Sequence, residues 1–174
     1  MQKNKIIFLV KSGLIAGIYA VLTLCLGPIS FGNLGFEMRI SEALTILPVF
    51  SFCAVPGLFV GCFLANLIGM AFSQLGLIDV VFGSFATLLA AVISWILRKV
   101  KIKGFPFLSF LPPIICNAII IGFELKLILP DVFPSFWWSF ISVGVGEMFS
   151  VFALGIPLFF AIKNIPFFKK YFID

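Results

Sequence analysis

Residues 77–97 read LIDVVFGSFATLLAAVISWIL, an apolar run whose single charge is that of Asp79. A helix that spans a bilayer needs about 20 largely apolar residues, and this run has that length. The chain continues with a basic stretch, residues 98–103, which reads RKVKIK. Positively charged loops beside spanning helices are retained in the cytoplasm. The sequence therefore predicts a membrane-spanning helix that ends at a cytoplasmic loop.

The composition of the whole chain agrees with this interpretation. Of the 174 residues, 62% are hydrophobic, and only 12 are basic and 7 acidic. Soluble domains carry about a quarter charged residues, so this chain has too few polar side chains to cover a water-soluble globule. Its length allows about six crossings and leaves no room for a separate soluble domain. We expect a single integral membrane domain over residues 1–174, in a multi-pass protein of a prokaryotic cell membrane.

Six apolar runs, separated by Gly, Pro and polar residues, predict an all-α membrane protein with six transmembrane helices in one bundle. The second run is interrupted by Pro48, so its helix is expected to be short. The predicted helices cover about residues 6–26, 40–52, 55–72, 77–97, 108–129 and 135–162.

Ten of the twelve basic residues lie in three groups. Six crossings put the N-terminus, the loop 98–103 and the C-terminus on one side of the membrane, and all three are basic. Charge and hydropathy therefore agree that both termini are cytoplasmic. Topology and attraction to the anionic lipids of the bilayer explain the basic balance, and we expect no nucleic-acid partner. The groups are Lys3, Lys5 and Lys11; Arg98, Lys99, Lys101 and Lys103; and Lys163, Lys169 and Lys170.

The residue types that are missing exclude several kinds of chemistry. The chain has no histidine, so Ser-His and Cys-His nucleophiles and zinc sites of the H-E-x-x-H type cannot be built. The four cysteines lie in apolar runs without C-x-x-C spacing, which indicates reduced core residues rather than metal ligands. We expect no metal, no bound cofactor and no enzymatic activity.

Polar residues inside or beside the predicted spans are the candidate site. An ionisable side chain at membrane depth costs a few kcal/mol or more, so each one is a candidate for function. Arg39 and Glu42 lie three residues apart at a helix start, where they could pair with each other or contact a ligand. Asp79 precedes an apolar run and suits a helix N-cap. The predicted substrate-binding residues are Arg39, Glu42, Asn66, Asp79, Asn117, Glu124, Trp138 and Glu147.

Glu147 is the acid for which a ligand role is favoured most. It lies mid-span with no basic residue in the neighbouring turns, and a buried carboxylate requires a cation or hydrogen-bond donors. Asn117 and Glu124 are two turns apart and share a helix face, and Lys126 indicates that Glu124 is close to the outer interface. Trp138 could anchor that interface or stack on a planar ligand.

Small residues recur at every fourth position on the first, third and fourth predicted helices. Such faces let helix backbones approach closely within a membrane. On the third and fourth helices we expect them to serve internal packing. The first helix carries two such pairs, Gly13 with Gly17 and Ala16 with Ala20.

Read in order, the polar stretches form a recognisable string. They include RISEAL at 39–44, PGLFVGCFLANL at 56–67, DVVFGSFAT at 79–87 and GVGE at 144–147. Together they resemble the QueT family, the membrane-embedded substrate-binding S components of energy-coupling factor (ECF) transporters that are assigned to queuosine precursors. The likeness covers about residues 12–160. One departure is Glu37-Met38, where related sequences more often read Gln-Phe before the arginine.

The resemblance implies a six-helix S component with two kinds of partner, a transmembrane coupling (T) protein and a pair of cytoplasmic ATPases. The chain has no G-x-x-x-x-G-K-[ST] loop, so ATP hydrolysis would be supplied by the partners. In such transporters an A-x-x-x-A face on the first helix docks the coupling protein. Ala16 and Ala20 match that pattern, which implies that this face is intermolecular.

The implied ligand is a 7-deazaguanine such as 7-aminomethyl-7-deazaguanine or queuine. Its guanine-like edge offers two donors that suit a carboxylate, and its aminomethyl cation suits a second carboxylate. Two other functions stay open at this stage. They are an S component for another vitamin or nucleobase, and a standalone carrier that relays protons through the buried acids. The missing histidine argues against an intramembrane enzyme.

Overall fold

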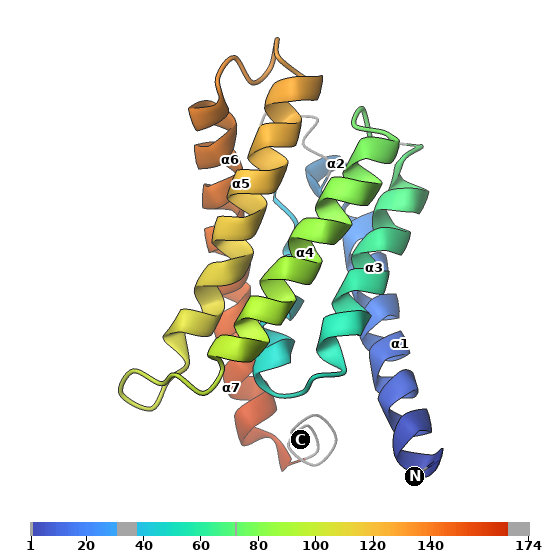
Figure 1. Cartoon of the computed structure of the whole chain (residues 1–174), viewed down its shortest axis with the longest axis vertical. Coiled ribbons are helices and arrows are strands. Elements are labelled where there is room, and N and C mark those ends of the chain that lie inside the picture. Colours follow the sequence, from blue (N-terminus) through green and yellow to red (C-terminus); the bar gives the residue numbers. More distant parts are fainter. Residues whose placement is uncertain (1, 31–37, 72, 167–174) are drawn as a thin grey trace.

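The computed structural model describes residues 2–30, 38–71 and 73–166. Within these ranges the chain is helical apart from short connections (Figure 1). The elements are α1 (Gln2–Cys25), α2 (Gly27–Ser30), η1 (Ile40–Val49), α3 (Ala54–Gly69), α4 (Leu77–Leu97), η2 (Phe107–Phe110), α5 (Leu111–Ile128), α6 (Phe136–Met148), η3 (Phe149–Gly155) and α7 (Ile156–Asn164).

Among the residues that the structure describes, four helical rods are long and apolar enough to cross a membrane. They cover Asn4–Cys25, Leu77–Leu97, Phe107–Ile128 and Phe136–Asn164. The two remaining predicted spans are shorter apolar helices, η1 and α3. The structure thus confirms an all-helical multi-pass membrane protein, while η1 and α3 do not reach the length of a full span.

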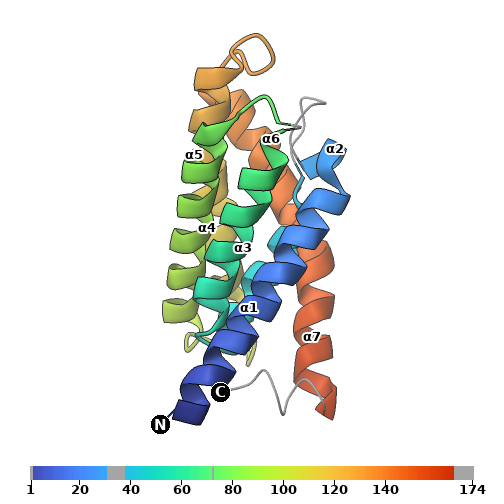
Figure 2. The same cartoon turned by 90° about the vertical axis from the view of Figure 1, so that its right-hand side faces the viewer.

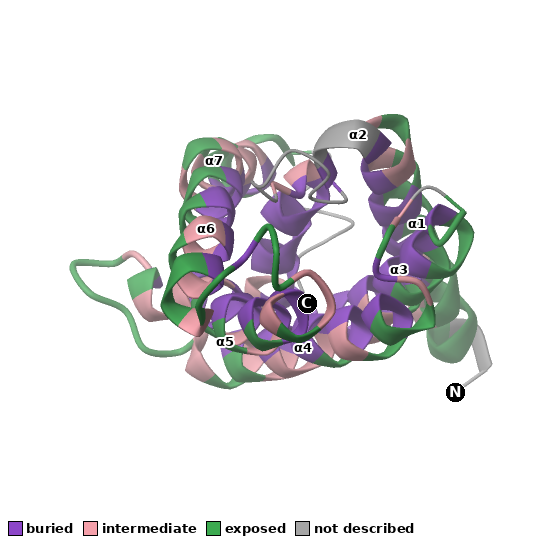
Figure 3. Cartoon of the chain, turned by 90° about the horizontal axis from the view of Figure 1, so that it is seen from above, coloured by how far each residue is buried: buried purple, intermediate pink, exposed green. Residues whose placement is uncertain are grey.

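The rods pack in chain order, with α1 against α3, α3 against α4, α4 against α5, and α5 against α6. Seen from above in Figure 3, these helices form a ring whose buried residues face inward. The segment η1 packs against α1, α3, α4 and η3, and every residue of Ser41–Pro48 is buried. It therefore fills the inside of the bundle and carries Glu42 with it.

The second predicted span is a 3-10 helix, not an α-helix. Pro48 lies inside η1, and because proline has no N–H group and its ring clashes with the preceding turn, it disfavours an α-helix there. A 3-10 helix rises about 2.0 Å per residue, so ten residues extend over about 20 Å. The short segment thus covers more of the membrane thickness than its length suggests.

The last predicted span is one continuous rod that changes its winding. A π-helical segment, η3, separates α6 from α7. It packs against η1, where a Cβ atom on Gly155 would lie 3.1 Å from Cγ2 of Ile46. Segments of π-helix are frequent at functional sites, and η3 begins two residues after Glu147.

The basic groups gather at one end of the bundle. Figures 1 and 2 show that α1 begins and α7 ends at this end, which also holds the loop between α4 and η2. Lys5, residues 98–103 and Lys163 therefore lie together, as the charge pattern predicted, while Lys169 and Lys170 are outside the described residues. The opposite end holds the connection between α5 and α6.

The small residues of the first and third helices pack against each other inside the bundle. A Cβ atom on Gly61 would lie 2.9 Å from the Ala16 carbonyl oxygen and 2.8 Å from the Tyr19 Cβ atom. Ala16 and Ala20 are 4% and 9% exposed. The expectation that they form an outward docking face is wrong, because that face of α1 is occupied by α3.

Candidate functional site

Polar side chains from six segments converge inside the bundle, and these segments are α1, η1, α3, α4, α5 and α6. Seven of the eight predicted substrate-binding residues are buried. They are Arg39, Glu42, Asn66, Asp79, Asn117, Glu124 and Glu147. Since few charged groups are left in the membrane interior without partners, the question is how these residues satisfy one another.

Arg39 and Asp79 form a buried ion pair in which one guanidinium nitrogen contacts both carboxylate oxygens. Arg39 Nη2 lies 2.8 Å from Asp79 Oδ1 and 2.9 Å from Oδ2. Arg39 Nη1 donates to Asn66 Oδ1 at 3.1 Å, and Asn66 Nδ2 donates to the Asp79 carbonyl oxygen at 2.9 Å. The three side chains therefore join the start of η1 to α3 and α4, and each compensates the polarity of the others.

The predicted N-cap role of Asp79 is wrong. The N-cap of α4 is Gly76, which has φ 62° and no side-chain cap. Asp79 lies in the first turn of the helix, and its carboxylate is directed to Arg39 across the bundle. A buried carboxylate gains more from a guanidinium, which is a charged donor, than from the neutral backbone N–H groups at a helix start. The ion pair thus joins Arg39 to a residue 40 positions further along the chain.

Glu42 occupies the centre of the cluster. Its Oε1 atom accepts a hydrogen bond from the Tyr19 hydroxyl and lies 3.5 Å from Thr87 Oγ1. Thr87 Oγ1 also lies 3.4 Å from the Cys62 sulfur, which accepts from Asn66 Nδ2 at 3.6 Å. This chain of contacts connects the Glu42 carboxylate to the Arg39–Asp79 pair.

Glu147 is held by the amide of Asn117. The distance from Asn117 Nδ2 to Glu147 Oε1 is 2.8 Å, and both residues are about 5% exposed or less. This bond joins α5 to α6 on the side of the site away from α3. The expectation that Asn117 and Glu147 belong to one site is consistent with this geometry.

The carboxylates of Glu42 and Glu147 face a common small cavity. Its volume is about 10 Å³, room for roughly one water molecule. The cluster is therefore closed upon itself in this conformation and is rich in acceptors, with three carboxylates near one guanidinium. The cavity is lined by Arg39, Glu42, Gly83, Asn117, Ile121, Val143 and Glu147.

A comparison with protein families matches almost the whole chain. The family described as QueT transporter covers residues 9–164. The chain belongs to the QueT transporter family. This confirms the resemblance carried by the buried polar stretches, and it makes the protein a transport component rather than an enzyme. No curated protein and no solved structure matches the chain.

Four of the eight predicted substrate-binding residues of this QueT protein do not line the cavity. Asn66 and Asp79 contact Arg39, which does line it. The other two are Glu124 and Trp138. Glu124 is on the same face of α5 as Asn117 and is buried, but it is seven residues or about 10.5 Å further along the helix. Trp138 is 59% exposed. Ser135 caps α6 by accepting a hydrogen bond from the Trp138 backbone N–H, and the exposed Trp138 side chain is not part of the buried cluster. Glu37 is outside the described residues.

Three residues that sequence reasoning did not assign to the site belong to it. They are Tyr19, Gly83 and Thr87. Tyr19 carried a signal, because the chain has only 2 tyrosines beside 24 phenylalanines and a buried tyrosine hydroxyl needs a partner. Gly83 and Thr87 follow Asp79 at intervals of one turn, and this periodicity was attributed to packing alone.

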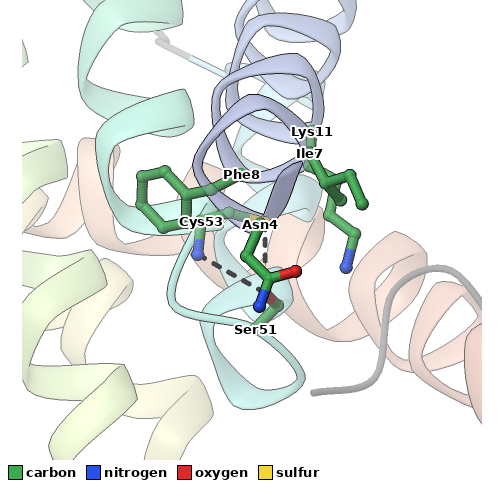
Figure 4. Close-up of a pocket in the computed structure, with 6 residues that line it drawn as sticks. All are labelled: Asn4, Ile7, Phe8, Lys11, Ser51 and Cys53. Atoms are coloured by element: carbon green, nitrogen blue, oxygen red, sulfur yellow. Dashed lines mark hydrogen bonds between the residues drawn. The ribbon is translucent and has the colours of Figure 1, made fainter. Parts of the chain in front are cut away.

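A larger hollow lies at the basic end and is unrelated to the cluster. Figure 4 shows it between α1 and the turn after η1, with Asn4, Lys11 and Ser51 around it. Its volume is about 310 Å³, and none of the predicted substrate-binding residues lines it. Among the residues that the structure describes, no group of three or more His, Cys, Asp or Glu side chains is placed to hold a metal ion.

Proposed function

We propose that this chain is the substrate-binding S component of an ECF-type importer, and that it captures a 7-deazaguanine such as 7-aminomethyl-7-deazaguanine or queuine. The observation that carries the proposal is the burial of Glu42 and Glu147 beside the Arg39–Asp79 pair in a chain of the QueT family. Burying several carboxylates within a membrane bundle costs free energy. A ligand rich in hydrogen-bond donors would bind to these carboxylates, which explains why they are present.

The chemistry of the ligand matches the acceptor-rich cavity. The N1–H and 2-amino groups of a 7-deazaguanine form a pair of donors that a single carboxylate accepts in a bidentate manner. Glu42 and Glu147 are the two carboxylates on the cavity, so one takes the guanine-like edge and the other the aminomethyl cation. Asn117 offers an amide to the ring carbonyl.

Ligand binding requires the cavity to open. A volume of about 10 Å³ is far below that of a two-ring heterocycle. Since Glu42 is on η1 and Glu147 adjoins η3, and these two irregular segments pack on each other, a shift of η1 against η3 separates the two carboxylates.

The orientation of the site fits uptake. With the basic end in the cytoplasm, both termini are cytoplasmic and the polar cluster lies in the outer half of the bundle. A T protein and two cytoplasmic ATPases then supply the driving force. The outward face of α1, which presents Gly13 and Gly17 with nothing within 4 Å of a Cβ atom at either position, is our proposed contact for the T protein.

Mass spectrometry of the small molecule that co-purifies with the protein tests the substrate. A 7-deazaguanine is expected from wild type and is lost from Glu147→Gln purified in parallel. If a different vitamin or nucleobase co-purifies, the chain is still an S component but its substrate is not a 7-deazaguanine. Uptake into proteoliposomes that contain this chain alone, without ATPases, would instead indicate a proton-coupled carrier that uses the buried acids.

A further inference from the structure

A basic cleft opens at the end of the bundle opposite the polar cluster. It has a volume of about 500 Å³ and lies between the end of η1, the loop after α4 and the helix α7. Four cationic side chains line it, from Arg98, Lys99, Lys101 and Lys163. Loop residues and a distant helix thus bring positive charge together from two parts of the chain.

The geometry of the loop holds these cations in place. Ile102 and Phe105 exchange backbone hydrogen bonds of 2.9 and 3.0 Å, and positive φ values at Lys103 and Gly104 close a tight turn between them. The Arg98 guanidinium lies 2.9 Å from the centroid of the Trp95 ring, a cation–π contact that orients it. The loop is therefore folded back on itself with Lys101 beside the cleft.

The cleft also has an apolar wall. Phe50, Pro106 and Phe159 line it together with the cations. In the loop that contributes three of the cations, the apolar side chains of Val100 and Ile102 are 46% and 51% exposed. A ligand in this cleft therefore meets positive charge on one side and lies beside surface that is suited to acyl chains.

No carboxylate of the described residues lines the cleft. Of the described acids, Glu42, Asp79, Glu124 and Glu147 are buried in the bundle, and Asp131 follows α5 at the opposite end. The described acids therefore contribute no negative charge to the lining of the cleft. Basic pockets between helices at the cytoplasmic face bind the head groups of anionic lipids.

We propose that this cleft binds the phosphate of an anionic phospholipid head group, with the acyl chains lying along the apolar side chains outside it. The phosphate accepts hydrogen bonds from the lysine and arginine side chains as a charge-assisted contact. A free phosphate offers the same anion but not the chains, and the exposed apolar rim favours the lipid. The inference is independent of which substrate the bundle transports.

Native mass spectrometry in an uncharged detergent tests the proposal, with phosphatidylglycerol as probe and phosphatidylcholine of the same chain length for comparison. Wild type is expected to retain about one phosphatidylglycerol and to show no comparable retention of phosphatidylcholine. The variant Lys101→Gln with Lys163→Gln removes two cleft charges, and its affinity is expected to fall about tenfold to thirtyfold.

The matched control is Lys5→Gln with Lys103→Gln, which removes two exposed charges from the same end but none from the cleft. Its affinity for phosphatidylglycerol is expected to stay within about twofold of wild type. An equal loss of phosphatidylglycerol affinity in both variants would show that the lipid is attracted by the overall positive charge of this end, and would overturn the proposed site. Saturable displacement of the lipid by inorganic phosphate would assign the cleft to a free anion. Carbodiimide cross-linking of Lys101 to a protein carboxylate, with lipid retention unchanged in the cleft variant, would assign it to a protein partner.

Discussion

The Asp79 carboxylate fills the space beside Gly83 in which a side chain at position 83 would lie. A Cβ atom there would be 2.8 Å from Asp79 Oδ1 and 2.5 Å from Asn66 Nδ2. The two residues are four apart on α4 and so lie on the same face. The ion pair of Arg39 with Asp79 thus depends on a glycine one turn further along the helix.

Gly83→Ala is expected to lower both the stability of the protein and its affinity for the ligand. The added methyl group displaces the Asn66 amide or the Asp79 carboxylate, and overpacking of this kind costs about 1–3 kcal/mol. Thermal unfolding in detergent and calorimetric titration with 7-aminomethyl-7-deazaguanine measure the two effects. The control is Gly144→Ala, where the nearest atom, Ala118 Cβ, is at an ordinary 3.6 Å. Similar behaviour of the two variants would contradict the role of Gly83.

The Arg39–Asp79 pair is expected to show strong thermodynamic coupling. Asp79→Asn leaves the guanidinium without its countercharge inside the bundle, which costs about 3–5 kcal/mol. In the double variant with Arg39→Gln neither charge remains, so stability should recover part of that loss. A double-mutant cycle of unfolding free energies gives the coupling. Additive effects would show that the ion pair is not a stabilising unit.

The helical fold could be predicted from hydropathy, but the winding of two segments could not. Pro48 marked an interruption in the second apolar run, yet its consequence, a 3-10 helix of ten residues, depends on packing against η3. No residue in Phe149–Gly155 distinguishes a π-helix from an α-helix by apolar pattern, because the whole rod is apolar. The π-helical segment η3 packs against η1, and this contact between distant parts of the chain is not visible in the local sequence.

The sequence predicted several of the residues that belong to the site, but not which of them contact each other. Polar residues in apolar runs are conspicuous, so Arg39, Asp79 and Glu147 were identified by depth alone. Their partners lie 40 and 30 residues away along the chain, and spacing along one helix contains no information about that distance. The expected N-cap of Asp79 and the outward face of Ala16 failed for this reason, since both used local spacing alone.

Glu147→Gln is expected to lose ligand affinity while the bundle stays folded. The glutamine carbonyl still accepts from Asn117 Nδ2, so the contact between α5 and α6 survives, but the negative charge on the cavity is gone. Calorimetry with 7-aminomethyl-7-deazaguanine should record a loss of at least about tenfold, in line with a charge-assisted bond. Glu124→Gln is the matched control, because Glu124 is equally buried and does not line the cavity. Unchanged affinity in Glu147→Gln would remove Glu147 from the site.

Substitutions on the two faces of α1 should separate folding from partner docking. Ala16 packs against Gly61, so Ala16→Leu forces α1 away from α3 and should lower stability by about 1–3 kcal/mol. Gly17 points outward, with nothing within 4 Å of a Cβ atom, so Gly17→Leu should leave unfolding unchanged and reduce co-purification of the T protein. Ligand titration checks that Gly17→Leu retains its site. Normal recovery of the T protein with Gly17→Leu would show that the coupling contact lies elsewhere, because a leucine at this position would obstruct any close approach of a partner helix to the face.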